Sequence, residues 1–222
     1  MKKIASLLLT FLLAFTVFAI PVKAYPAART LEIVEDGIIS TGKNGKGISV
    51  KEYQASNELG VYSILYIKNT SKEMKDISGT FKFYNGKKLI GTSGDSATAL
   101  SPGKTAILEV KVADNATKCK YKLAIRKSIY KYGNNKLEIT ETGGDSTHVI
   151  VSVKNNAKKK EYVNATVIFF KGGECVGFGY SYVPDTHLPK GEEAVISVNN
   201  WLDTKRTYDD YLISIEGRYY KR

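Results

Sequence analysis

Apolar and polar residues alternate with a period of two along much of the chain. Alternation of this kind predicts half-buried β-strands. It occurs in four well-defined places, namely at Leu65 and Ile67, at Phe81 and Phe83, from Val149 to Val153, and at Val167 and Phe169. Asn85-Gly86 and Gly172-Gly173 follow two of these segments and are typical hairpin turns. No ten-residue amphipathic helical pattern accompanies them, so the pattern predicts an all-β, antiparallel sandwich.

The chain contains an internal duplication. Leu65-Tyr-Ile-Lys-Asn69 matches Val151-Ser-Val-Lys-Asn155 at an offset of 86 residues. The same offset aligns the two hairpin segments, and matching landmarks follow in the same order to the end of the chain. We therefore predict two tandem antiparallel Ig-like β-sandwich domains related by duplication, residues 47–130 and 135–222. Residues 25–46 form an N-terminal segment in which Leu31–Val34 is a candidate strand of the first domain.

The order of short motifs resembles a known domain family. Lys68-Asn-Thr is followed by Phe81-x-Phe-Tyr-Asn-Gly, then by Leu89-Ile-Gly-Thr, and then by Leu100-x-Pro-Gly-x-x-Ala. This order resembles the FxLYD-type Ig-like domain of bacterial secreted proteins, and the second copy matches it more loosely. The resemblance implies an extracellular or envelope-associated β-sandwich. It implies no catalytic residue and no known ligand.

The first 24 residues have the layout of a secretory signal peptide. Lys2 and Lys3 precede an uncharged apolar run from Ile4 to Ile20, and small residues end the segment at Ala24. This layout predicts cleavage after Ala24 and a secreted protein, extracellular or associated with the cell wall, with no transmembrane segment after cleavage. Retention of the run as a membrane anchor is the alternative. The short basic start and long apolar core favour a Gram-positive bacterial signal.

The chain is basic, with a formal net charge of +11. Lys118, Lys120 and Lys122 alternate with Tyr121 and Leu123, so a strand would place the three lysines on one face and the apolar residues toward the core. Together with three nearby cations they form a predicted basic stripe: Lys118, Lys120, Lys122, Arg126, Lys127 and Lys131. Its functional interpretation is a binding site for a cell-wall polyanion. Protection of a sheet edge is the alternative. No nucleic-acid module is recognisable, so intracellular DNA or RNA is not an expected partner.

Exposed aromatic residues suggest a second kind of site. Tyr180, Tyr182 and Trp201, the only tryptophan, are the residues of this kind. These three side chains are candidates for stacking on sugars, as in a carbohydrate-binding or adhesin-like module. A protein partner is a further alternative.

Catalytic and metal-binding patterns are weak. Cys119 and Cys175 fall in different repeats, which leaves an interdomain disulfide open. Cys175 with His187 is a conceivable thiol–imidazole pair, but a role in the strand core explains Cys175 better. Asp203, Asp209 and Asp210 could hold calcium through their oxygens, but a solvated acidic loop explains them better. We expect no enzyme activity, no cofactor and no metal, and a binding or structural role at the cell envelope.

Overall fold

The structure is a computed structural model that describes residues 31–40, 47–57, 60–130 and 133–218. The predicted signal peptide and Lys131 lie outside these residues. Nearly all regular structure is β-strand, and a single turn of 3-10 helix, η1, spans Asn134–Lys136. No helix in the described part of the chain has the length and apolar character needed to cross a membrane. The predicted all-β fold class is confirmed.

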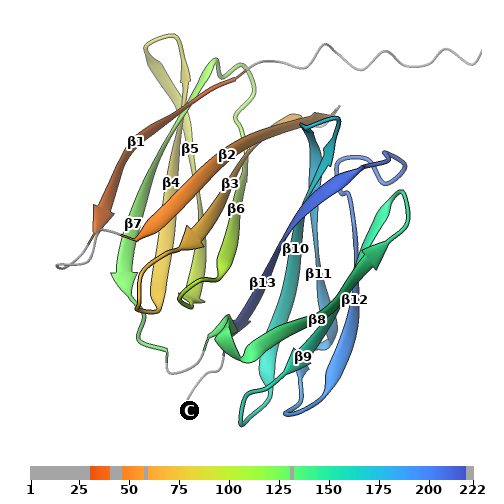
Figure 1. The fold of residues 1–222 in the computed structure, drawn as a ribbon. Helices are drawn as coiled ribbons and strands as arrows, with labels where there is room; N and C mark the ends of the chain where they lie inside the picture. Colours follow the sequence, from red (N-terminus) through yellow and green to blue (C-terminus); the bar gives the residue numbers. More distant parts are fainter. Residues whose placement is uncertain (1–30, 41–46, 58–59, 131–132, 219–222) are drawn as a thin grey trace, which may run out of the picture.

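The described residues form thirteen strands, which fall into two halves (Figure 1). The first half contains β1 (Glu32–Ser40), β2 (Ile48–Asn57), β3 (Gly60–Asn69), β4 (Lys75–Asn85), β5 (Lys88–Leu100), β6 (Thr105–Lys111) and β7 (Lys118–Lys127). The second half contains β8 (Leu137–Gly144), β9 (His148–Asn155), β10 (Glu161–Lys171), β11 (Glu174–Leu188), β12 (Glu193–Asn199) and β13 (Asp210–Arg218). Both predicted hairpins are present, as β4–β5 and β10–β11.

Each half is a sandwich of two sheets. In the first half an outer sheet of order β1-β7-β4-β5 packs on an inner sheet of order β2-β3-β6. In the second half the inner sheet has order β11-β10-β13 and the outer sheet has order β12-β9-β8. Among the described strands every pair is antiparallel except β1–β7, which is parallel. This pair departs from the predicted antiparallel pattern because β1 and β7 come from opposite ends of the half, where no hairpin turn constrains their direction.

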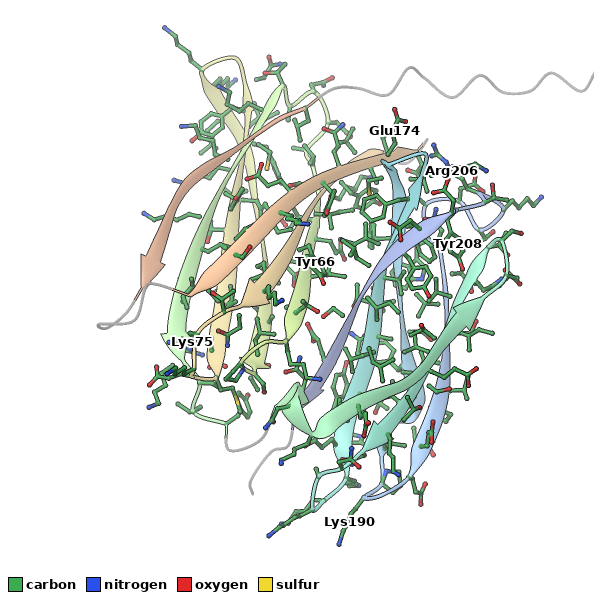
Figure 2. The ribbon with its side chains drawn as sticks, viewed as in Figure 1. Tyr66, Lys75, Glu174, Lys190, Arg206 and Tyr208 are labelled. Atoms are coloured by element: carbon green, nitrogen blue, oxygen red, sulfur yellow. The ribbon has the colours of Figure 1, made fainter. Side chains whose placement is uncertain are left out.

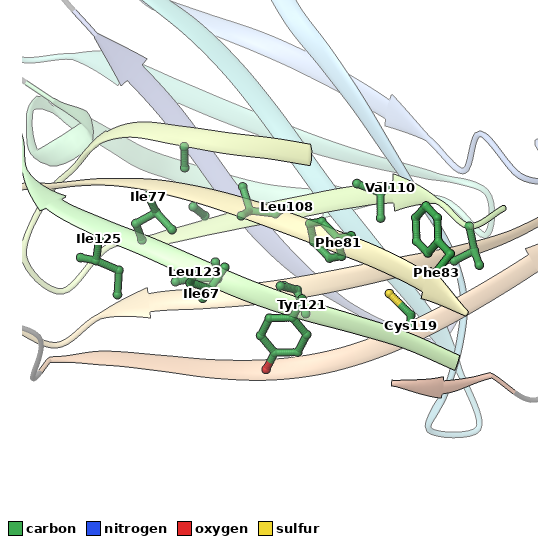
Figure 3. Packing of buried hydrophobic residues seen from close by; sticks show 14 of the residues in the cluster. Ile67, Ile77, Phe81, Phe83, Leu108, Val110, Cys119, Tyr121, Leu123 and Ile125 are labelled. Atoms are coloured by element: carbon green, nitrogen blue, oxygen red, sulfur yellow. The ribbon is translucent and has the colours of Figure 1, made fainter. Parts of the chain in front are cut away.

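The core of each sandwich comes from the inward residues of alternating strands. Phe81 on β4 and Tyr121 and Leu123 on β7 are fully buried in the first sandwich. Figure 3 shows them with Cys119 and Ile125, which also lie on β7. The Tyr121 hydroxyl reaches the edge of this core and donates a hydrogen bond to Glu52 Oε1 at 2.6 Å. The second core has the same character, with Phe169 as its largest fully buried side chain.

The duplication extends to individual hydrogen bonds. Asn69 Nδ2 donates to the carbonyl oxygens of Glu73 and Leu100, both at 2.8 Å. Asn155, 86 residues later, donates in the same way to the carbonyl oxygens of Lys159 and Leu188, at 2.9 and 2.8 Å. In both copies the asparagine backbone oxygen accepts from a glycine of a tight turn, Gly103 or Gly191, and both glycines have a φ of 77°. A buried asparagine that closes the same turn twice supports a common origin for the two halves.

The two inner sheets pack against each other, so the four sheets form one stack (Figure 1). An interdomain cluster of apolar residues lies between them. It consists of the buried residues Ala55, Ile64, Ile107, Ile168, Phe170, Phe178 and Leu202, with Tyr53, Tyr62, Tyr66, Cys175 and Leu212 packed around them. Figure 2 shows Tyr66 between the two sandwiches. Edge-on ring contacts cross the boundary, with Tyr53 and Phe170 centroids 5.0 Å apart.

Polar contacts also join the halves near the linker. The side chain of Asn134 accepts a hydrogen bond from Ser101 N at 3.0 Å and donates to Ile215 O at 2.8 Å. Ser214 Oγ donates to Thr105 O at 2.7 Å. These bonds fall on buried or half-buried groups, where an unmade hydrogen bond is costly. The interface is thus held by apolar packing and by directional bonds.

Candidate functional site

The alternating lysines lie as the sequence predicts. Cys119, Tyr121, Leu123 and Ile125 are buried in the first core, while Lys118, Lys120 and Lys122 project from the opposite face of β7. Strand geometry forces this division because successive side chains point to opposite faces. The outer sheet of the first sandwich therefore presents these three lysines on its outward face.

The strand beside β7 enlarges this surface. Lys82 on β4 pairs in register with Lys120, and Tyr84 pairs with Lys118. Lys120 Nζ lies 5.9 Å from the centroid of the Tyr84 ring, a cation–π contact. We call Lys82, Lys118, Lys120 and Lys122 the basic face. Lys82 is not among the predicted stripe residues, although its position between the inward residues Phe81 and Phe83 was sufficient to place it outward.

Small hydroxyl and glycine residues surround the basic face. Thr80, Thr92, Gly94 and Ser96 are exposed on β4 and β5, and Thr92 pairs with Lys82. The carboxylate on this part of β5 points the other way, because Asp95 Oδ2 accepts a hydrogen bond from Glu109 N of the inner sheet at 2.9 Å. The outward residues described on this part of β4, β5 and β7 thus carry mainly ammonium and hydroxyl groups.

The linker end of the predicted stripe is different. Arg126 Nε lies 3.3 Å from Asp76 Oδ2, and Lys127 Nζ lies 3.2 Å from Glu73 Oε1. Hydrogen bonds from Lys75 and Lys127 lower the pKa of Glu73, which keeps it ionised. Both cations therefore have local carboxylate partners. Lys131 lies outside the described residues, and the stripe as a binding site stays a prediction.

Edge protection does not explain the alternating lysines. β7 lies between β1 and β4 in the sheet and pairs with both, so it is not an edge strand. Lysine side chains that guard an edge lie on strands with unpaired backbone groups. The lysines of β7 instead occupy the middle of a sheet face.

The three aromatic candidates come together in space. The ring centroids of Tyr180 and Tyr182 are 5.7 Å apart, and those of Tyr180 and Trp201 are 3.7 Å apart. Tyr162 on β10 adds a fourth ring, 5.8 Å from Tyr182. We call Tyr162, Tyr180, Tyr182 and Trp201 the aromatic cluster. The sequence named Tyr180, Tyr182 and Trp201 as exposed aromatic residues, but it gave no sign that Tyr162 joins them.

Two glycines of β11 allow the loop that carries Trp201 to pack closely against this strand. A Cβ at Gly179 would overlap the carbonyl oxygen of Asn199, and one at Gly177 would overlap the Asn200 side chain. The close approach lets Trp201 N donate to Phe178 O at 2.8 Å and Asn200 Nδ2 donate to Val176 O at 3.1 Å. The glycine spacing in β11 is therefore what brings Trp201 to Tyr180.

The cysteines have the properties of buried apolar residues. Cys119 lies in the core of the first sandwich and Cys175 in the interdomain cluster, and both are free thiols. Burial raises the pKa of each thiol to about 11, so neither is a thiolate at neutral pH. Cys175 pairs with Phe170, whereas His187 pairs with Tyr162 eight residues away on β10. That separation is about 26 Å, and a thiol–imidazole pair is excluded.

The three aspartates near the end of the chain serve as local caps. Asp203 Oδ1 accepts from Lys205 N, Asp209 Oδ2 from Gly172 N, and Asp210 Oδ1 from Tyr211 N. Within the described ranges no group of three or more histidine, cysteine, aspartate or glutamate side chains is placed to hold a metal ion. The aspartates thus have structural partners of their own.

Comparisons with known proteins add little to this picture. No protein-family model and no curated protein matches the chain. A solved structure of red sea bream transglutaminase is similar at 10% sequence identity with a TM-score of 0.26, covering 78% of this chain and 29% of that one. This chain therefore spans less than a third of that structure. A likeness so distant carries no argument, and the FxLYD resemblance stays a prediction.

Proposed function

We propose that this protein is a secreted, non-catalytic module of the cell envelope that the basic face holds at an anionic surface. The observation that carries the proposal is the alignment of four lysines on adjacent strands, with Lys82 and Lys120 directly opposite each other. Like charges on neighbouring strands repel and destabilise a sheet. We attribute their concentration on one outward face of the sheet to attraction for an external polyanion.

The chemistry of the face suits a phosphate-rich polymer. Lysine ammonium groups are strongly hydrated point charges that attract phosphate without requiring a fixed planar geometry. Exposed hydroxyls at Thr80 and Thr92, beside the lysines on the same face of the sheet, add hydrogen-bond donors and acceptors. A flexible polyanion such as wall teichoic acid can contact such a surface along its length. The signal-peptide layout and the FxLYD resemblance support the same compartment.

Binding of residues 25–222 to washed Gram-positive cell walls tests this proposal. We expect co-sedimentation at low salt and release as salt rises toward about 1 M, where the screening length falls to about 3 Å. Walls stripped of teichoic acid should bind less protein. The charge-reversed triple variant Lys118→Glu, Lys120→Glu, Lys122→Glu should lose most of its binding at about 0.15 M salt.

A second triple variant controls for net charge. Lys158, Lys159 and Lys160 are all exposed between β9 and β10, far along the chain from the basic face. Reversing them changes the charge by the same amount and should leave most of the binding. Equal losses in the two triple variants, or no loss in the first, would overturn the proposed role of the basic face.

A further inference from the structure

A second surface lies on the inner sheet of the second sandwich, where the aromatic cluster reaches solvent. Tyr182 is 40% exposed and Trp201 is 47% exposed, although each touches another ring. Three separate segments supply the rings: β10, β11 and the loop that follows β12. Large apolar side chains that remain exposed in a contiguous group commonly mark a binding site.

The aromatic cluster extends beyond the edge of the interdomain cluster. Phe178 belongs to that cluster and contacts Tyr62, with ring centroids 5.3 Å apart. Tyr162 and Tyr182 stand outside the cluster and continue the row as far as His187, whose ring centroid is 6.1 Å from that of Tyr162. The row therefore extends beyond the part of the sheet that the first sandwich covers.

The backbone holds the cluster in place before any ligand arrives. Trp201 N donates to Phe178 O, and the Asn200 side chain ties the same loop to β11 and to Leu202 N. Tyr180 and Tyr182 are fixed by their pairing with Thr166 and Asn164 on β10. Rings held in this way lose little conformational entropy when a ligand stacks on them.

We propose that the aromatic cluster is a binding site for a neutral chain of β-linked pyranose sugars. The apolar faces of such sugars stack on aromatic rings, while their hydroxyl or acetamido groups need hydrogen-bond partners nearby. The Tyr180 and Tyr182 hydroxyls and the Trp201 indole N–H can supply such partners, whereas Thr166 and Asn164 Oδ1 on the neighbouring strand are buried. Burial raises the pKa of the Tyr180 phenol, which remains a neutral donor.

The size of the patch favours a sugar over a protein. Aromatic side chains bury 150–250 Å² each when fully covered, so Tyr182 and Trp201, 40% and 47% exposed, together with the less exposed Tyr180 offer roughly 250 Å². A stable protein interface uses about 800 Å² on each partner. Two or three sugar rings match the smaller area.

The sole tryptophan of the chain provides a direct reporter. We expect titration of residues 25–222 with chitohexaose or cellohexaose to change the Trp201 emission in a saturable way, and the change should persist at about 0.5 M salt. Tyr182→Ala should weaken the apparent affinity about tenfold, as loss of a stacking anchor does. Tyr84→Ala, which removes an aromatic ring from the basic face, should leave the titration unchanged.

This inference is independent of the polyanion proposal, and the two can fail separately. The lysine triple variant should keep the tryptophan response, whereas Tyr182→Ala should keep salt-sensitive wall binding. An emission that neither saccharide alters would overturn the inference, as would an equal response in a folded Tyr182→Ala variant. A concentration-dependent dimer that Tyr182→Ala abolishes, without a saccharide response, would assign the cluster to a second copy of the chain.

Discussion

Lys75 and Glu161 occupy equivalent positions in the two halves, 86 residues apart, and carry opposite charges in equally buried places. Lys75 is 2% exposed and Glu161 is 0% exposed. Lys75 Nζ reaches Glu73 Oε2 at 3.1 Å, at the base of the first sandwich (Figure 2). Neither carboxylate oxygen of Glu161 accepts a hydrogen bond. At this duplicated position the buried ammonium group has an ion-pair partner, whereas the buried carboxylate accepts no hydrogen bond.

We predict that Glu161 makes the protein less stable as pH rises. Burial raises its pKa from 4.5 to about 7. Between these values the folded state binds more protons than the unfolded state, so the free energy of unfolding falls as pH increases from about 4.5 to 7. The cost is about 1.4 kcal/mol for each unit by which the pKa is raised. Glu161→Gln should be more stable than the wild type at pH 8 and nearly equal to it at pH 4.

Denaturant unfolding at several pH values measures this difference. Burial also raises the pKa of Glu109 to about 7, so only the difference between variant and wild type isolates Glu161. Glu174→Gln, at an exposed carboxylate on β11, is the matched control and should show no such trend. A Glu161→Gln variant whose stability follows the wild type at every pH would contradict the assignment.

Gly179 should be intolerant of even a methyl group. A Cβ there meets the backbone of Asn199, which must move because no flexible side chain is available to yield. We expect Gly179→Ala to destabilise the fold by about 1–3 kcal/mol, in the range of overpacked sites. The same shift should displace Trp201 from Tyr180 and alter its fluorescence in the folded state.

Gly143→Ala is the comparison for this prediction. Gly143 lies on β8, and a Cβ added there meets nothing within 4 Å. Its stability and its tryptophan spectrum should match the wild type. If Gly179→Ala behaves in the same way, the close approach of the loop to β11 does not exist in solution.

The interdomain cluster predicts that the two sandwiches unfold together. Phe170 faces the first sandwich and contacts Tyr53, whereas the neighbouring Phe169 faces the core of the second sandwich. Phe170→Ala should lower the interaction free energy between the two sandwiches by about 3–5 kcal/mol and divide the thermal transition into two. Phe169→Ala should lower the stability of the second sandwich while the contacts of the interdomain cluster stay unchanged.

Scanning calorimetry of residues 25–222 distinguishes these outcomes. The wild type should show one cooperative transition whose calorimetric and van't Hoff enthalpies agree. Two independent transitions in the wild type would mean that the interdomain cluster contributes little to stability.

Continuous apolar runs in β3 and β10 indicate that these strands are buried on both faces, which alternation alone does not indicate. Ile64 and Leu65 on β3 point to opposite sides, one into the interdomain cluster and the other into the first core. Ile168 and Phe169 divide in the same way on β10. Strands buried on both faces read as unbroken apolar stretches. The runs indicate two-sided burial, but they do not say which sheet covers the second face.

The sequence by itself determined the all-β fold class, the duplication and the face on which each strand residue lies, because a strand's period of two is a local property. It therefore placed Lys118, Lys120 and Lys122 outward on one strand face. Tertiary structure decided the parallel partner of β7, the contact of Trp201 with Tyr180, and the pairing of Arg126 with Asp76. These features join segments far apart in the chain. Long-range packing selects them, and no local period records that choice.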